Sequence, residues 1–318
     1  MNKPNSLRHL SAPGSGKVRI RYRLSGVLAC LIPIILFFKV DALMSREMPN
    51  LKYAEVDGNE LFLDLYLPEI NIPSDGAPLI IYIHGGAWRA GSRSSVPVRK
   101  LVDFGYAIAS VDYRLTPVAP FPANIHDLKA SVRYLRSRAG DLGFNAGKIT
   151  VIGSSAGGHL AALLGITSND KILEGTVGGK SLQDYDSSIQ GIVSFYGASN
   201  LETILSQSTP HGLSVREPAL KLLLGGLPDA KPELARLASP VAHIDANDPP
   251  LLLIHGDQDP QMPVNQSLEL VGHYRKHHLT VELEIVHGGK HGGPGFYEED
   301  MIKKVDAFIR QNVLSPNQ

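Results

Sequence analysis

Residues 148–165, KITVIGSSAGGHLAALLG, decide the fold. A short β-rich run leads into Gly153-Ser154-Ser155-Ala156-Gly157, and a stretch rich in small residues predicts a helix from position 156. A GxSxG match alone is weak evidence, but a strand before it and a helix after it indicate a sharp turn whose neighbours must be small. Such a turn raises Ser155 above the sheet as the candidate nucleophile. It also directs the N–H of Ala156 toward the group attacked. Ser154 lies one residue early and is expected to face away from the cleft.

Outward from this turn, apolar strand patterns alternate with helical ones. Strands are expected at 78–84, 107–113, 149–152, 189–196, 250–255 and 281–286, and helical spacing is found at 122–139 and 302–309. Residues 60–67 alternate like a half-buried edge strand. The alternation indicates an α/β fold with a mostly parallel central sheet and helices on both faces. Two insertions rich in Gly, Ser and Pro, 167–188 and 197–248, are expected to wall a substrate pocket.

A second glycine-rich turn follows the apolar strand at 78–84, in the sequence His84-Gly85-Gly86-Ala87-Trp88. An oxyanion hole needs a backbone donor from outside the GxSxG turn, and a turn of this kind brings main-chain N–H groups close to the reacting centre. We therefore expect the N–H groups of Gly86 and Ala87, together with that of Ala156, to bind the oxyanion. His84 is expected to fix the loop. Trp88 is assigned to the substrate pocket, with a packed scaffold role as the alternative.

A serine hydroxyl needs a histidine base to take its proton. His291 lies in a glycine-rich loop between the last strand and the last helix, where a triad histidine belongs in the chain order Ser, Asp, His. His287, at the strand end, is the alternative. The spacing of these two histidines would suit zinc on a helix, but the glycines between them disfavour a helix, so no metal is expected.

The acid that orients the base is expected in the loop after the preceding strand, which reads His255-Gly256-Asp257-Gln258-Asp259-Pro260. Asp259 is the candidate. Asp257 is the alternative and is better suited to forming the turn.

These motifs resemble the α/β-hydrolase superfamily, and within it the bacterial esterases related to feruloyl and acetylxylan esterases and to the hormone-sensitive-lipase group. The resemblance rests on HGGAW at 84–88, GSSAGGHLAALLG at 153–165, the HGDQD loop, KHGGPGF at 290–296 and the segment 105–136. It implies the α/β-hydrolase fold, a Ser-His-Asp triad that cleaves carboxylic esters through an acyl-enzyme, and no cofactor. It also implies a small-molecule or carbohydrate-linked ester as substrate. Ala87 stands where many members have a third glycine, but its N–H is retained.

Composition narrows the possibilities further. The chain has 318 residues, equal numbers of basic and acidic residues, and one cysteine. Zero net charge argues against a nucleic-acid partner. One cysteine excludes an internal disulfide and a CxxC zinc site. Metalloprotease, P-loop and dinucleotide motifs are absent from the sequence.

The first 42 residues differ in character from the rest. Residues 1–40 hold seven basic and no acidic residues, and the uncharged run LSGVLACLIPIILFF occupies 24–38. A basic stretch before an apolar run is the order of a signal peptide or signal anchor. We therefore divide the chain into an export segment, 1–42, and a catalytic domain, 43–318. The domain is expected in the periplasm or outside the cell, in contact with the membrane through 24–40 if the segment is uncleaved.

Three other functions share some of these features. A serine peptidase and an arylformamidase-type amidohydrolase would use the same fold and triad. A non-catalytic, membrane-tethered binding protein would be expected to lack a triad member.

Overall fold

The computed structural model describes residues 46–168 and 170–315. The proposed export segment, residues 1–42, lies outside the described residues. Within the described ranges, no helix combines the length and the apolar character that crossing a bilayer requires.

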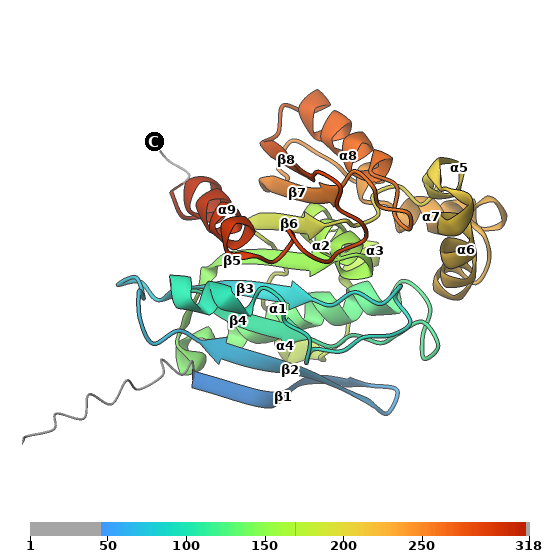
Figure 1. Cartoon of the computed structure of the whole chain (residues 1–318). Coiled ribbons are helices and arrows are strands. Elements are labelled where there is room, and N and C mark those ends of the chain that lie inside the picture. Colours follow the sequence, from blue (N-terminus) through green and yellow to red (C-terminus); the bar gives the residue numbers. More distant parts are fainter. Residues whose placement is uncertain (1–45, 169, 316–318) are drawn as a thin grey trace, which may run out of the picture. The chain divides into compact units, whose positions relative to one another are not determined.

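An eight-stranded sheet forms the centre of the fold, in the order β1-β2-β4-β3-β5-β6-β7-β8 (Figure 1). The pairs β1–β2 and β2–β4 are antiparallel, and the other five pairs are parallel. The prediction of a mostly parallel sheet is therefore confirmed. The strands are β1 Arg46–Val56, β2 Asn59–Leu67, β3 Ala77–Ile83, β4 Ala107–Val111, β5 Phe144–Ser154, β6 Gly191–Phe195, β7 Leu251–Gly256 and β8 Val281–Val286.

The antiparallel edge differs from the sequence prediction. Strand β2 was expected at the edge, but β1 pairs along its outer side. The sequence pattern does not reveal β1 because its register shifts twice, between Met48 and Leu51 and between Lys52 and Ala54. These irregularities disrupt the alternation by which a strand is recognised, and only Tyr53 and Ala54 of β1 are buried.

Helices cover both faces of the sheet, as predicted (Figure 1). One face carries α1 Ala123–Leu142, α2 Ala156–Ile166 and α8 Asn265–Lys276. The other carries the 3₁₀ turn η1 Arg99–Phe104, α9 Glu299–Ile309 and the π-helical turn η4 Arg310–Leu314. Helix α1 ends where Gly143 adopts φ +86°, a left-handed conformation that favours glycine.

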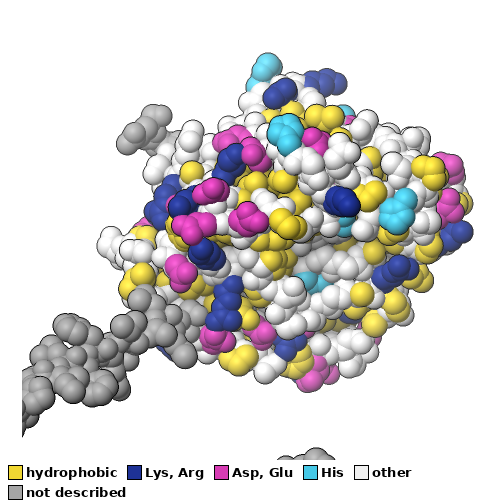
Figure 2. Space-filling view, viewed as in Figure 1, with side chains coloured by type: hydrophobic (Ala, Val, Ile, Leu, Met, Phe, Trp, Pro, Cys, Tyr) yellow, Lys and Arg dark blue, Asp and Glu magenta, His cyan; other side chains and the backbone are white. Residues whose placement is uncertain are grey.

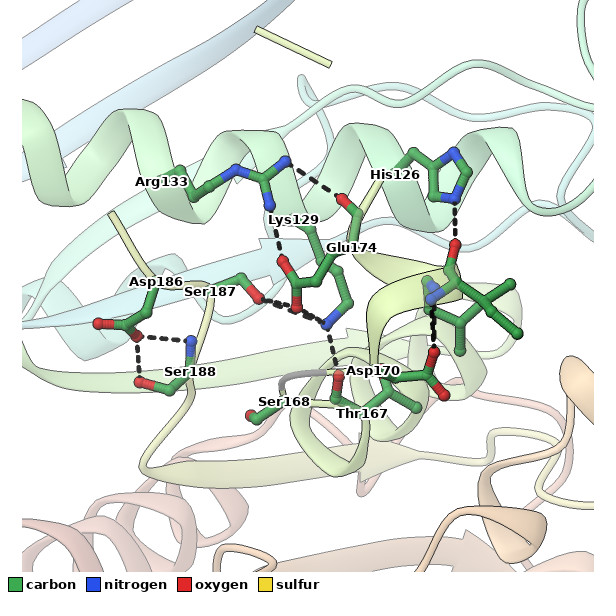
Figure 3. Close-up of polar contacts among 12 residues, drawn as sticks. His126, Lys129, Arg133, Thr167, Ser168, Asp170, Glu174, Asp186, Ser187 and Ser188 are labelled. Atoms are coloured by element: carbon green, nitrogen blue, oxygen red, sulfur yellow. Dashed lines mark hydrogen bonds and ion pairs between the residues drawn. The ribbon is translucent and has the colours of Figure 1, made fainter. Parts of the chain in front are cut away.

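The insertion 167–188 contains two short helices, α3 Lys171–Glu174 and α4 Lys180–Gln183. It follows the C-terminal end of α2, whereas Ser155 precedes the N-terminal end of that helix. The insertion therefore starts near the amino ends of the parallel strands, away from Ser155. Figure 3 shows how it is fixed to α1: Lys129 Nζ donates to Glu174 Oε1 at 2.7 Å, and Arg133 Nη1 donates to Glu174 Oε2 at 2.7 Å. None of its described residues, 167–168 and 170–188, lines either pocket beside Ser155. The expectation that this insertion walls the pocket is therefore wrong.

The insertion 197–248 does reach the pocket, as predicted. It contains α5 Ile204–Gln207, α6 Pro210–Leu224, α7 Pro232–Leu237 and the short turns η2 Pro228–Ala230 and η3 Pro240–Ala242. Val215 and Arg216 of α6 line the pocket that contains Ser155.

Acidic and basic side chains are interspersed over the face of the molecule seen in Figure 2.

Candidate active site

Ser155 stands at a tight bend between β5 and α2. Its backbone has φ +56° and ψ −118°, which is strained for a residue with a side chain. A Cβ at Gly153 would lie 2.1 Å from the carbonyl oxygen of Gly157, and a Cβ at Gly157 would lie 2.1 Å from that of Ile83. Both glycines are therefore required by close backbone packing, which holds Ser155 above the end of the sheet.

The structure brings Ser155, His291 and Asp259 together. Ser155 Oγ lies 2.8 Å from His291 Nε2, and His291 Nδ1 lies 2.7 Å from Asp259 Oδ2. They follow the carboxyl ends of β5, β8 and β7, which belong to the parallel run β5-β6-β7-β8, so these ends lie at one edge of the sheet. With Asp259 ionised, Nδ1–H donates to the carboxylate and Nε2 is free to accept the serine proton.

The Asp259 carboxylate is buried and fully hydrogen-bonded. Its Oδ1 accepts the main-chain N–H groups of Gln261 and Met262, at 2.8 and 2.9 Å. Burial by itself raises the pKa of this carboxyl, but the donors His255 and His291 outweigh burial and hold the pKa well below its usual range. Asp259 therefore carries a full negative charge beside His291 at neutral pH.

The two alternative residues pair with each other instead. His287 Nδ1 lies 3.0 Å from Asp257 Oδ2, and Asp257 also accepts the N–H of Gly288. His287 is largely exposed. Neither side chain contacts Ser155, so the geometry favours His291 and Asp259 over both alternatives.

The proposed oxyanion donors lie around the same hydroxyl. Gly86 and Ala87 have φ +113° and +52°, which turns the chain sharply after β3. Both line the pocket that contains Ser155 and His291. Among the described residues, no oxygen accepts the N–H of Gly86, Ala87 or Ala156. These three groups are therefore free to donate to a ligand.

Trp88 does not belong to the pocket. Its side chain is completely buried, and its Nε1–H donates to His159 Nδ1 at 3.1 Å. His159 Nε2–H in turn donates to the carbonyl of Ala238 at 2.7 Å, and burial lowers the pKa of His159 to about 4, which keeps it neutral. The prediction that Trp88 lines the pocket is wrong, because the indole packs in the core and is hydrogen-bonded there to His159.

Two neighbouring pockets open beside the serine. One, of about 440 Å³, contains Ser155, His291, the 85–87 turn and α6 residues. The other, of about 380 Å³, is lined by Tyr82, Tyr196, Tyr297 and residues of the 84–97 segment, among them Ser92 and Ser95. Ser154 lines both pockets, so the expectation that it faces away from the cleft is wrong. Its Oγ is hydrogen-bonded to Tyr82 at 2.8 Å. The second pocket and Arg216 have no signal in the sequence pattern.

The sequence matches the BD-FAE family over residues 63–274. The chain belongs to this family. Esterase LipC of Mycobacterium tuberculosis is 33% identical over 208 residues, which are 64% of this chain and 50% of LipC. This chain therefore spans about half the length of the curated relatives that it matches.

Solved structures agree with the family. A truncated carbohydrate esterase from gut microbiota is 29% identical, with a TM-score of 0.74, and covers 86% of this chain and 98% of its own. An acetyl ester-xyloside bifunctional hydrolase from Caldicellulosiruptor lactoaceticus is 26% identical, with a TM-score of 0.67, over 84% of this chain and 96% of its own. The resemblance to the α/β-hydrolase esterases is confirmed. In the described part of the chain, no three His, Cys, Asp or Glu side chains are grouped to hold a metal ion.

Proposed function

We propose that this protein is a serine esterase, which hydrolyses carboxylic esters through a covalent acyl-enzyme. The observation that carries the proposal is the hydrogen-bond chain from Ser155 through His291 to Asp259, with three unpaired N–H donors around the hydroxyl. The names of the similar proteins support the same reaction class, since several are esterases.

The first half of the reaction forms the acyl-enzyme. His291 Nε2 takes the proton of Ser155 as its Oγ attacks the acyl carbon. The N–H groups of Gly86, Ala87 and Ala156 donate to the oxyanion of the tetrahedral intermediate. The same histidine then gives its proton to the alkoxide of the leaving alcohol as the ester C–O bond breaks.

The second half uses water. His291 takes a proton from a water molecule, the hydroxide attacks the acyl carbon, and Ser155 leaves with the proton as the carboxylic acid departs. Asp259 stays ionised throughout and stabilises the charged imidazolium. His291 therefore takes part in every proton transfer of the two halves.

The proposal for the substrate class is supported by the relatives rather than by the geometry. Two structurally similar proteins are a carbohydrate esterase and an acetyl ester-xyloside bifunctional hydrolase. We therefore propose a small-molecule or carbohydrate-linked ester as substrate. The sequence of residues 1–42 supports export of the domain to the periplasm or the cell exterior, with anchoring by residues 24–40 if they are retained.

The test compares two adjacent serines. Ser155→Ala is expected to lower kcat on a small ester by a factor on the order of 10⁴–10⁶, because triad members act as a unit. Ser154→Ala is the matched control and should keep most of the activity. A fluorophosphonate probe should label the wild type and the control but not Ser155→Ala. Retention of activity within tenfold by Ser155→Ala would refute the assignment, and faster turnover of formyl amides or peptides than of every ester would favour an amidohydrolase or peptidase.

A further inference from the structure

Arg216 of α6 lies in the pocket of the candidate triad. It is almost completely buried, with 2% of its surface exposed, yet it lines the same pocket as Ser155 and His291. Its Nε and Nη2 both donate to one main-chain oxygen, that of Gln261, at 3.1 and 2.6 Å. A guanidinium has five N–H donors, and these two bonds use only Nε and Nη2. No group among the described residues accepts a hydrogen bond from Nη1.

The charge of Arg216 is also without a direct ion pair. Arg133 is equally buried, but it pairs with Glu174 at 2.7 Å. In the described ranges, no carboxylate lies within ion-pair distance of Arg216. The charge of Asp259 acts on Arg216 without a direct contact, and the oxygens of Asp259 are already occupied by His291 and by main-chain N–H groups. Burying an unpaired charge is costly.

The charged state of Arg216 survives its burial. Burial lowers the pKa of Arg216 to about 10, and Asp259 partly offsets that effect. The side chain is therefore a cation at neutral pH. Arg89, which is exposed, lines the same pocket, whereas no Asp or Glu is among the described residues that line it. The pocket beside the nucleophile is therefore positively charged.

We infer that this pocket binds a carboxylate of the substrate, held by the free edge of the Arg216 guanidinium. The planar fork of arginine matches a carboxylate geometrically, and a charge-assisted hydrogen bond is stronger than a neutral one. The inference rests on the proposed esterase function and narrows it to esters with an acidic group. That group can belong to the acyl chain or to the alcohol.

The test uses pairs of substrates that differ only in the acidic group. For the acyl side, the mono-4-nitrophenyl esters of succinic, glutaric and adipic acid are used. Each is compared with the compound in which the second carboxyl is a methyl ester. For the alcohol side, 3-acetoxybenzoate is compared with its methyl ester. The measured quantity is the ratio of kcat/KM for the anionic member to that for the neutral member. We expect this ratio to be roughly 10 to 100 for either the acyl-side or the alcohol-side pairs.

Three variants assign that ratio to Arg216. Arg216→Met, which keeps the length of the side chain but removes its charge, should bring the ratio close to one. Arg216→Lys should restore part of it. Arg133→Met removes an equally buried arginine elsewhere and should leave the ratio unchanged. The ratio is internal to each preparation, so partial unfolding of a variant does not alter it.

The outcomes separate this inference from the proposed function. If Arg216 only holds Gln261 in place, Arg216→Met will lower both rates equally, and the inference is wrong. A wild-type ratio at or below one for every pair also overturns it, whether or not any variant folds. In both cases, hydrolysis of the neutral esters that depends on Ser155 leaves the proposed function standing. Failure to hydrolyse any ester contradicts both.

Discussion

The substitution Glu174→Gln tests whether the insertion 167–188 serves stability rather than catalysis. Among residues 46–168 and 170–315, Glu174 is the single carboxylate paired with two buried cations on α1, Lys129 and Arg133, which are 0% and 2% exposed (Figure 3). In the glutamine variant both cations remain buried. Lys129 keeps the carbonyl of Thr167 at 2.6 Å, and Arg133 keeps the main-chain oxygen of residue 174 at 3.2 Å. The side chain loses its charge and one of its two acceptor oxygens, which accept from Lys129, Arg133 and Ser187 in the wild type.

The structure sets the size of the effect. Removing one partner of a buried ion pair costs about 3–5 kcal/mol because the other charge is left uncompensated. Glu174 is 25% exposed, and a glutamine oxygen still accepts one hydrogen bond, so we expect the lower end, about 3 kcal/mol. At about 2–4 °C per kcal/mol for a domain of this size, Tm should fall by roughly 6–12 °C.

Calorimetry or thermal circular dichroism measures the fall in Tm, and ester hydrolysis at 25 °C measures function. Glu299→Gln is the matched control. It also removes a carboxylate shared by two cations, Lys100 and Lys303, but all three side chains are more than 45% exposed, so Tm should stay within error. Equal Tm values for the two variants would refute the argument from burial. A tenfold loss of kcat/KM in folded Glu174→Gln would show that the insertion does shape the site.

Three further predictions concern the site and its surroundings. Asp259→Asn should lower kcat on esters about 10³–10⁴-fold, because an amide N–H facing Nδ1 selects the wrong histidine tautomer, whereas Asp257→Asn should change kcat less than about threefold; the reverse order would move the acid to Asp257. Gly157→Ala places a Cβ 2.1 Å from a β3 carbonyl and should abolish activity or soluble expression, whereas Gly140→Ala, in an open position on α1, should raise stability by about 0.5–1 kcal/mol. Burial raises the pKa of Asp248 to about 7, so its contribution to stability is present below the unfolded value of about 4 and is lost as the pH rises to 7. Asp248→Asn should therefore raise Tm at pH 8 but not at pH 4, and an equal shift at both pH values would contradict the assignment.

Sequence reasoning located the candidate triad because chain order and sheet topology are linked. In a parallel sheet the loops after the strands meet at one edge, so the GxSxG turn and the loops with Asp259 and His291 could be placed together from motifs and strand patterns. The sequence leaves Asp257 as an alternative to Asp259, since both lie in one short loop. The structure separates them by burial and by partner, which sequence spacing does not encode.

Other features had no readable pattern. Trp88 follows a glycine-rich turn, and only its complete burial and its hydrogen bond to His159 show that the indole turns inward. Strand β1 is hidden by its bulges. The insertion 167–188 looked like the other long loop in composition, but its position after the C-terminal end of α2 puts it at the opposite edge of the sheet from Ser155. Composition identifies a loop, whereas the direction of the preceding element decides which edge of the sheet it reaches.

The loop after β7 links the candidate triad to the proposed carboxylate site. Asp259 is held by the N–H of Gln261, and the carbonyl of the same residue is the acceptor for Arg216. One peptide segment therefore sets the position of the acid and of the buried cation. Any change at Arg216 also disturbs the support of Asp259, so a fall in rate alone says nothing about substrate charge. A change in the preference for acidic over neutral esters would have no such structural explanation, because Asp259 acts identically on both.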